Sequence, residues 1–213
     1  MKINKNVPNI LTMVRIAFTP IIIVLFLLPI QKGIGVFVAL GLYILGCFTD
    51  FLDGHIARKY NLISNFGKFM DQIADKFITT TAMILVLFSG VVAGEMPWLP
   101  MIMVLIVVLR DILISGIRMF AASKNIVIAA DIFGKIKSFF LDIASMILMF
   151  YIGLVLCLGS MDAKLGAMPI TYIEYAGLAL MIVGTVLSLI SCVNYSVKAV
   201  QALKAKNQEN EGK

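Results

Sequence analysis

Six stretches of mostly apolar residues follow one another along the chain. Each is close to the roughly 20 residues that an α-helix needs to cross the hydrocarbon core of a bilayer. Backbone N–H and C=O groups meet no water there, so such segments must satisfy their hydrogen bonds internally, as helices. We therefore expect an all-α integral membrane bundle of six transmembrane helices in one domain, residues 1–200, followed by a polar tail, residues 201–213. The expected helices are 11–30, 34–57, 68–93, 97–121, 132–159 and 170–200.

The composition indicates that the chain has more apolar residues than a single buried core can hold. Hydrophobic residues make up 61% of the 213 residues and charged residues 14%, whereas a soluble domain carries about 25% charged residues. We expect the surplus apolar surface to face lipid. Arg15 and Pro20 interrupt the first apolar run, and no small-residue cleavage pattern follows Pro29. We interpret that run as a retained first helix and not as a cleaved signal peptide.

The lysines and arginines between these segments are distributed unevenly. The chain ends and one set of connections are rich in them, whereas the opposite connections contain Lys32 and Lys164 alone. Because cations accumulate on the cytoplasmic side, we expect six spans in the cytoplasmic (cell) membrane, with both termini in the cytoplasm. The net charge of +6 then makes this face basic, which suits anionic membrane lipids or phosphorylated substrates. No nucleic-acid-binding motif is present, so no nucleic-acid partner is expected.

Four aspartates stand out in this apolar chain. Asp50 and Asp53 are three residues apart near the end of the second segment, and Asp71 and Asp75 are four apart near the start of the third. At 3.6 residues per turn, each pair lies on one face of its helix. The connection between the two segments is short, so the helices return antiparallel. We expect the two pairs to converge at the cytoplasmic interface.

Bare carboxylates in one small volume would repel one another strongly. Two unit charges about 6 Å apart cost roughly 3 kcal/mol at an effective dielectric of 20. Oxygen ligands without several histidines or paired cysteines favour a hard ion, and four carboxylates suit two of them. We therefore expect two divalent cations, Mg²⁺ or Mn²⁺. The alternative is a set of interfacial aspartates solvated by headgroups and paired with nearby cations, namely Arg58, Lys59, Lys68 and Lys76.

This stretch resembles the signature of the CDP-alcohol phosphotransferases. The matching residues read Asp50-x2-Asp53-Gly54-x2-Ala57-Arg58-x8-Gly67-x3-Asp71-x3-Asp75. Members of that family are six-helix membrane enzymes, often homodimeric, that transfer a phosphatidyl or similar group from a CDP-linked donor to an alcohol. The resemblance implies that Asp50, Asp53 and Asp71 hold the metals. Asp75 would join them or act as general base on the acceptor hydroxyl.

The resemblance also assigns residues to the donor, CDP-diacylglycerol. Gly54 and Ala57 lack bulk, so a nucleotide can approach the helix there, and Arg58 would bind the phosphates. An Asn-x-x-Thr before the first helix would touch the nucleotide, although it could equally be an ordinary helix cap. The donor-binding positions implied are Asn9, Thr12, Asp50, Gly54, Ala57, Arg58 and Ser64.

A second stretch bears on the acceptor alcohol. Residues 109–138 are similar to a pattern of the phosphatidylglycerophosphate-forming branch of the family, R-E-x-x-[IL]-S-G-[IL]-R followed by G-K-x-K-[ST]; Asp111 stands where that branch usually has Glu. The resemblance implies a cationic pocket for glycerol 3-phosphate, formed by Arg110, Arg118, Lys135 and Lys137. Simple pairing of Asp111 with Arg110 or Arg118 is the structural alternative.

Other functions stay open on the sequence alone. A related enzyme could use inositol phosphate, serine or phosphatidylglycerol as its acceptor. A divalent-cation transporter could use the aspartates as a binding site, but transporter acids tend to lie at mid-membrane in broken helices or repeats. These aspartates lie at one face, and no internal repeat is evident. The sequence therefore favours phosphatidyl transfer to glycerol 3-phosphate.

Overall fold

The computed structural model describes residues 7–28, 33–59, 65–94, 96–124, 132–158 and 167–211. Side chains are described within these ranges except at 7–11, 51–59, 65–69, 71–72, 132, 135, 167–169 and 205–211. The described part is all-α, as the sequence predicts. Its helices are α1 (Val7–Leu27), α2 (Ile34–Lys59), α3 (Asn65–Phe88), α4 (Trp98–Ser123), α5 (Ile132–Leu158) and α6 (Ala167–Glu211).

Three of the described helices contain segments that are long and apolar enough to cross a membrane. These segments are Trp98–Ser123, Ile136–Leu158 and Ile170–Lys204, and two shorter apolar segments are Thr12–Leu27 and Ile34–Asp50. Many large apolar side chains point outward, among them Phe88 and Met119, each 73% exposed. Such a surface is unusual for a water-soluble protein and fits a membrane protein.

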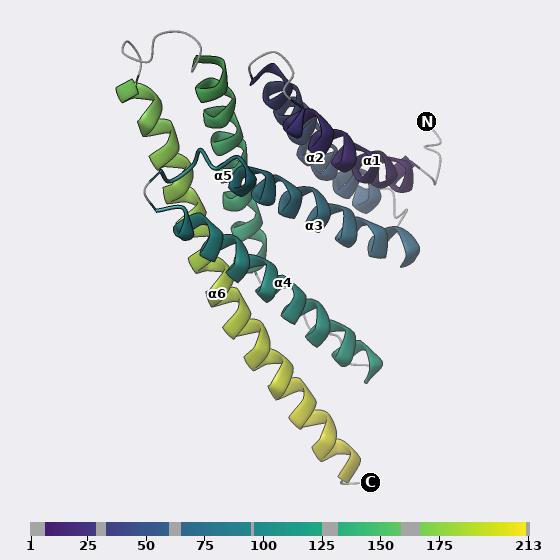
Figure 1. Ribbon diagram of the computed structural model, residues 1–213. Helices are drawn as coiled ribbons and strands as arrows, with labels where there is room; N and C mark the ends of the chain where they lie inside the picture. Colours follow the sequence, from purple (N-terminus) through teal and green to yellow (C-terminus); the bar gives the residue numbers. More distant parts are fainter. Residues whose placement is uncertain are drawn as a thin grey trace.

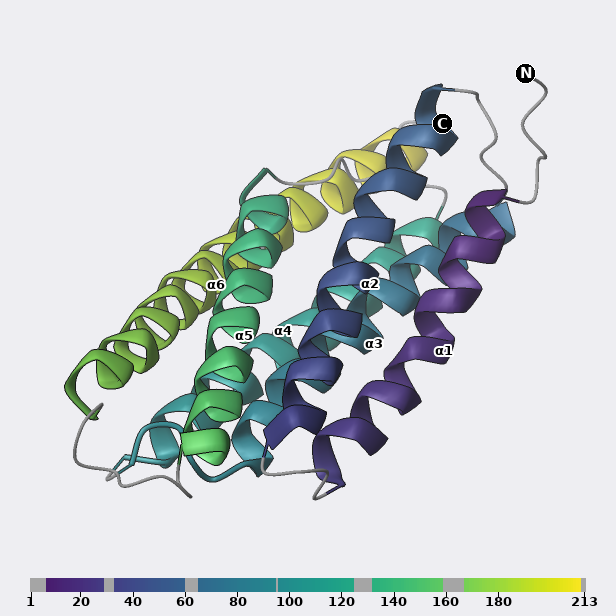
Figure 2. The same ribbon diagram turned by 90° about the horizontal axis from the view of Figure 1, so that it is seen from above.

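The helices alternate in direction along the bundle (Figure 1). The beginnings of α1, α3 and α5 and the ends of α2, α4 and α6 point towards the same end. Helix α6 packs along α5 and, further on, against α4, while α1 packs against α2 and α3. Seen from above, α5 and α6 form one flank and α1 and α2 the other (Figure 2). This alternation puts the start of α1 and the end of α6 at one end of the bundle.

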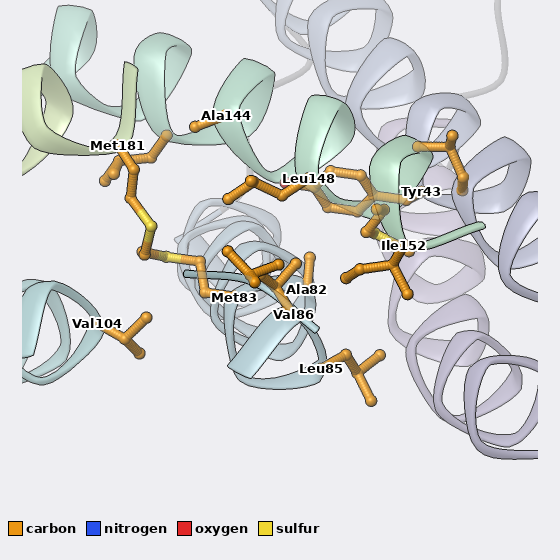
Figure 3. Close-up of a cluster of buried hydrophobic side chains, with 14 of the residues drawn as sticks. Tyr43, Ala82, Met83, Leu85, Val86, Val104, Ala144, Leu148, Ile152 and Met181 are labelled. Atoms are coloured by element: carbon orange, nitrogen blue, oxygen red, sulfur yellow. The ribbon is translucent and has the colours of Figure 1, made fainter. Parts of the chain in front are cut away.

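The core lies where α2, α3, α5 and α6 meet (Figure 3). Tyr43 and Ile152 are completely buried, and Met83, Leu148 and Met181 are nearly so. Glycines let α5 and α6 approach closely: a Cβ on Gly177 would lie 2.6 Å from Leu148, and one on Gly184 would lie 2.7 Å from Leu141. Small residues commonly allow such contacts between membrane helices.

Two helix ends differ most from the sequence expectation. Helix α3 ends at Phe88 and not near residue 93, because the chain turns through left-handed backbone at Gly90 (φ 64°) and Ala93 (φ 67°). The Ala93 N–H donates to Glu174 of α6 at 2.5 Å, which fixes this turn. Helix α6 extends past residue 200 to Glu211, so the start of the polar tail continues the last helix.

Candidate active site

The aspartates near the end of α2 and the start of α3 approach each other. Asp50 and Asp75 are half-buried, and both carboxylates interact electrostatically with the thiol of Cys47, which lies one turn before Asp50 on α2. Because helices α2 and α3 run antiparallel, the end of α2 and the start of α3 lie at the same end of the bundle, where α1 begins (Figure 1). The described members of the two predicted pairs therefore lie on two helices at the same end of the bundle.

The remaining signature residues are placed by backbone only. Asp53 lies one turn after Asp50 in α2, and Asp71 lies one turn before Asp75 in α3, so each pair keeps to one side of its helix. The side chains of several predicted donor and metal residues lie outside the described residues; these are Asn9, Asp53, Gly54, Ala57, Arg58 and Asp71, and Ser64 lies outside entirely. Their predicted roles stay predictions.

Arg15 of α1 is joined to this site. Its side chain is 0% exposed, and Nη1 donates to Oδ1 of Asp50 at 2.5 Å. The aliphatic part of Arg15 runs past Gly46, one turn before Asp50, where a Cβ would lie 3.8 Å from Cγ of the arginine and 2.4 Å from Cδ1 of Ile78. Gly46 thus lets α1, α2 and α3 approach closely. Arg15 orients the carboxylate of Asp50 through their ion pair.

The two described aspartates have the donor chemistry that divalent cations need. Asp50 and Asp75 carry carboxylates on two different helices, and carboxylates are the ligands that Mg²⁺ and Mn²⁺ prefer. Within the described side chains, no cluster of three or more His, Cys, Asp or Glu residues gathers closely enough to hold an ion. Asp53 and Asp71, whose side chains lie outside the described residues, stay predicted ligands.

A second polar cluster lies between α4, α5 and α6. Asp111 of α4 accepts two charged hydrogen bonds on Oδ1, from Nη1 of Arg110 at 2.6 Å and from Nζ of Lys137 at 2.5 Å. Nη2 of Arg110 donates to Oγ of Ser191 on α6 at 2.6 Å. Two cations share one carboxylate, so the cluster has a net positive charge. Its side chains are mostly buried, with 9% of Arg110 and 6% of Lys137 exposed.

The other predicted acceptor cations are placed differently. Arg118 lies over the ring of Tyr195 on α6, 5.9 Å from the ring centroid, an arrangement typical of a cation–π contact. The side chain of Lys135 lies outside the described residues. The structure therefore brings Arg110 and Lys137 together on Asp111, and the structural alternative, an Asp111–Arg110 pair, is present as well.

Lys76 was not predicted as part of the acceptor cluster. It follows Asp75 on α3, donates to Oγ of Ser115 on α4, and approaches the carbonyl of Asp111 at 3.4 Å. Its charge interacts with those of Asp111, Arg110, Arg118 and Asp75. Lys76 thus lies between the aspartates and the cationic cluster. Its position beside Asp75 was the available signal in the sequence, but the sequence alone did not show that this face meets α4.

A groove of about 600 Å³ runs between α3 and α4 next to these residues. Lys76, Asp111 and Ser115 form its polar end, and the rest is lined mainly by apolar side chains such as Ile84 and Ile112. The polar end therefore lies beside the aspartates, at the border between charged groups and lipid-facing surface.

The chain matches a known enzyme family. A model of the CDP-alcohol phosphatidyltransferases matches residues 5–189, which include all four aspartates as well as Arg110, Asp111 and Lys137. The chain belongs to this family. The match also covers Arg15 and Ser115, while Ser191, the partner of Arg110 on α6, lies just beyond it.

Individual relatives are similar over nearly their whole length. The chain is 34% identical over 197 residues to a protein of Rickettsia bellii (strain RML369-C), with 92% of this chain and 96% of the relative covered. It is 31% identical over 212 residues to one of Bacillus subtilis (strain 168), covering 95% and 99%, and 30% identical over 192 residues to one of Escherichia coli (strain K12), covering 89% and 92%. All three relatives are named CDP-diacylglycerol–glycerol-3-phosphate 3-phosphatidyltransferase.

Proposed function

We propose that this enzyme transfers the phosphatidyl group of CDP-diacylglycerol to glycerol 3-phosphate, giving phosphatidylglycerophosphate and CMP. The observation that carries this proposal is that Lys76, which follows Asp75 on α3, contacts Asp111 and Ser115 at the buried cationic cluster, in a chain of this family. The names of the relatives support the choice of glycerol 3-phosphate over inositol phosphate, serine or phosphatidylglycerol. Family membership disfavours the transporter alternative.

The reaction forms one P–O bond and breaks another. The sn-1 hydroxyl oxygen of glycerol 3-phosphate attacks the phosphorus that carries diacylglycerol, and its proton passes to a carboxylate oxygen of Asp75. The bond between that phosphorus and the oxygen of CMP breaks, and CMP leaves with the electron pair. Arg15 keeps Asp50 in a fixed orientation throughout. Positioning and electrostatic stabilisation supply most of the catalysis in such phosphoryl chemistry.

Two divalent cations, Mg²⁺ or Mn²⁺, belong to this proposal. Asp50, Asp53, Asp71 and Asp75 would hold them, and when bound they would neutralise charge on the phosphates. Arg58 would bind the donor's phosphates, while Asn9, Thr12, Gly54, Ala57 and Ser64 would contact the nucleotide. Thr12 is buried in α1, one turn before Arg15, which is compatible with either this role or a local one.

The acceptor's phosphate would bind at the second cluster. Arg110 and Lys137 converge on Asp111, and a phosphate entering there would share their hydrogen bonds. Arg118 and Lys135 complete the proposed pocket, and Lys76 would link it to Asp75. Because Lys76 connects the pocket to Asp75, the phosphate of glycerol 3-phosphate would anchor the molecule while its hydroxyl reaches the donor.

We further propose six spans in the cytoplasmic membrane, with both termini and the active site on the cytoplasmic side and a homodimer as the assembled enzyme. The alternating helix directions (Figure 1) and the excess of cations at the chain ends support this topology. The donor is a membrane lipid, so a site at one membrane face lets it react without leaving the bilayer.

The proposed function predicts a defined substrate requirement. Purified enzyme in detergent micelles should release CMP from CDP-diacylglycerol with glycerol 3-phosphate and Mg²⁺, and chelation by EDTA should abolish the release. Serine, inositol phosphate and phosphatidylglycerol serve as matched acceptors in parallel reactions. Activity with serine but none with glycerol 3-phosphate would refute the proposal. Metal flux into proteoliposomes without CDP-lipid would support the transporter alternative.

The acceptor pocket predicts a selective effect of Lys137→Met. A hydrogen bond to a charged group contributes about 1.5–3 kcal/mol, so KM for glycerol 3-phosphate should rise roughly 10- to 100-fold, while KM for CDP-diacylglycerol changes little. Lys204→Met, at an exposed position of α6, is the control and should leave both KM values unchanged. An equal rise of the two KM values in Lys137→Met would contradict the assignment.

A further inference from the structure

Asp142 of α5 lies in a polar junction that the proposed reaction does not use. Its Oδ1 atom accepts hydrogen bonds from the hydroxyl of Tyr43 on α2 and from Oγ1 of Thr79 on α3, both at 2.9 Å. Tyr43 is 0% exposed, and Asp142 lies inside the apolar segment Ile136–Leu158. A carboxylate within a membrane segment is costly, and such residues usually serve function.

The junction lies one to two helical turns from Asp50 and Asp75, towards the middle of the bundle. Tyr43 precedes Asp50 by seven residues, which is two turns along the same face of α2, and Thr79 follows Asp75 by four residues, one turn along the same face of α3. Cys47, between the two levels, interacts electrostatically with Asp142 as well as with Asp50 and Asp75. The junction therefore contacts the two helix faces that carry the metal-binding signature.

Helices α2 and α3 need such a link because they touch each other little. Each packs mainly against α1 and α5, so the relative height of their aspartates is set through those neighbours. Lipid supplies no hydrophobic force that would fix this height, whereas interhelical hydrogen bonds do fix it. A shift of α3 by one residue would move Asp75 by about 1.5 Å along the axis, and a misplacement of that size can cost about 100-fold in rate.

We propose that Asp142 is a positioning residue that sets the register between α2 and α3, and with it the separation of Asp50 and Asp53 from Asp71 and Asp75. It touches neither substrate nor metal. It acts through Tyr43 and Thr79, whose hydroxyls both donate to its Oδ1 atom. This inference rests on the proposed aspartate metal site but concerns how that site is held together.

The test compares three variants of the full-length enzyme in micelles. Asp142→Leu removes both hydrogen bonds, Asp142→Asn keeps a carbonyl oxygen that can accept both, and Gly177→Ala disturbs α5–α6 packing at Leu148, away from the junction. The readouts are Mn²⁺ affinity from an EPR titration, kcat, KM for glycerol 3-phosphate and the thermal unfolding midpoint.

Asp142→Leu should lower kcat and Mn²⁺ affinity at least about tenfold, with KM for glycerol 3-phosphate within about twofold of wild type because the Arg110–Lys137 cluster is untouched. Asp142→Asn should restore both to within about threefold. Gly177→Ala should lower the unfolding midpoint while kcat and Mn²⁺ affinity of the folded protein stay unchanged.

The proposal is overturned if Asp142→Leu behaves like Gly177→Ala, that is, if its unfolding midpoint falls while its kcat and Mn²⁺ affinity stay unchanged. An Asn variant as impaired as the Leu variant would also overturn it. Failure of the proposed function gives a different result, namely wild-type enzyme that binds Mn²⁺ but releases no CMP; the effect of Asp142→Leu on Mn²⁺ affinity then still decides the inference. Wild-type protein without Mn²⁺ binding would overturn both.

Discussion

Replacing Asp75 with asparagine is expected to reduce CMP release by about 100- to 10,000-fold, the usual contribution of general acid–base catalysis. An asparagine has nearly the same shape as aspartate, so packing on α3 is preserved, but the amide cannot take the proton of the acceptor hydroxyl. The measurement is CMP release from CDP-diacylglycerol with saturating glycerol 3-phosphate and Mg²⁺. Unchanged activity in this variant would remove Asp75 from the base role.

Metal affinity separates the two roles proposed for Asp75. If Asp75 acts as base alone, Mn²⁺ affinity of Asp75→Asn should remain close to that of wild type while kcat falls. If it also ligates an ion, the affinity should fall together with kcat, by about tenfold or more. Thr80→Val, on the same helix beyond the site and lining the groove between α3 and α4, is the control and should leave both quantities unchanged.

Arg15→Gln is expected to have the second-largest effect. Arg15 is completely buried and ion-paired with Asp50, so its removal takes the arginine's charge away from a carboxylate of the proposed metal site. Loss of a residue that orients a metal ligand typically costs 10- to 100-fold in activity or affinity. Because Asp50 is 39% exposed, water partly compensates, and we expect a stability loss of about 1–3 kcal/mol, below that of a fully buried pair.

Thermal unfolding and CMP release together check this expectation. Arg15→Lys keeps the charge but not the planar guanidinium, so it should restore part of the stability and less of the activity. Thr19→Val is the matched control, since Thr19 is buried on the same helix and its hydroxyl donates to the backbone carbonyl of Arg15. Wild-type activity and stability in Arg15→Gln would show that the pair has no role in the site.

The positions of the helices and the faces carrying the aspartates could be predicted from the sequence. Apolar segments of membrane length and spacings of three and four residues depend only on local geometry, which the chain order determines. The end of α3 at Phe88 could not be predicted, because the left-handed turn at Gly90 and Ala93 is held by Glu174 of α6, which is distant in the sequence. Local sequence pattern therefore predicts where the helices lie, whereas tertiary contacts determine where a helix such as α3 ends.

The partners of the site residues could not be predicted in the same way. Arg15 and Asp50 are 35 residues apart, Thr79 and Asp142 are 63 apart, and Tyr43 and Asp142 are 99 apart. Helical periodicity shows which residues share a face, but not which other helix that face will meet. Arg15 therefore first stood out only as an interruption of an apolar run, although it is the most deeply buried charge described in the site.

The length of helix α6 exceeds the thickness of the membrane core, and this helix also contacts the cationic cluster. The stretch Ile170–Lys204 has 35 residues, roughly 52 Å at 1.5 Å per residue, whereas the hydrocarbon core is only about 30 Å thick. Its last third contains Asn194, Lys198 and Lys204, so the helix reaches beyond the core, and its tilt responds to the thickness of the bilayer around it. Ser191, which accepts a hydrogen bond from Arg110, lies a little past the middle of this stretch. A change in the tilt of α6 would therefore move one wall of the proposed acceptor pocket, so bilayer thickness and acceptor binding would be linked through this helix.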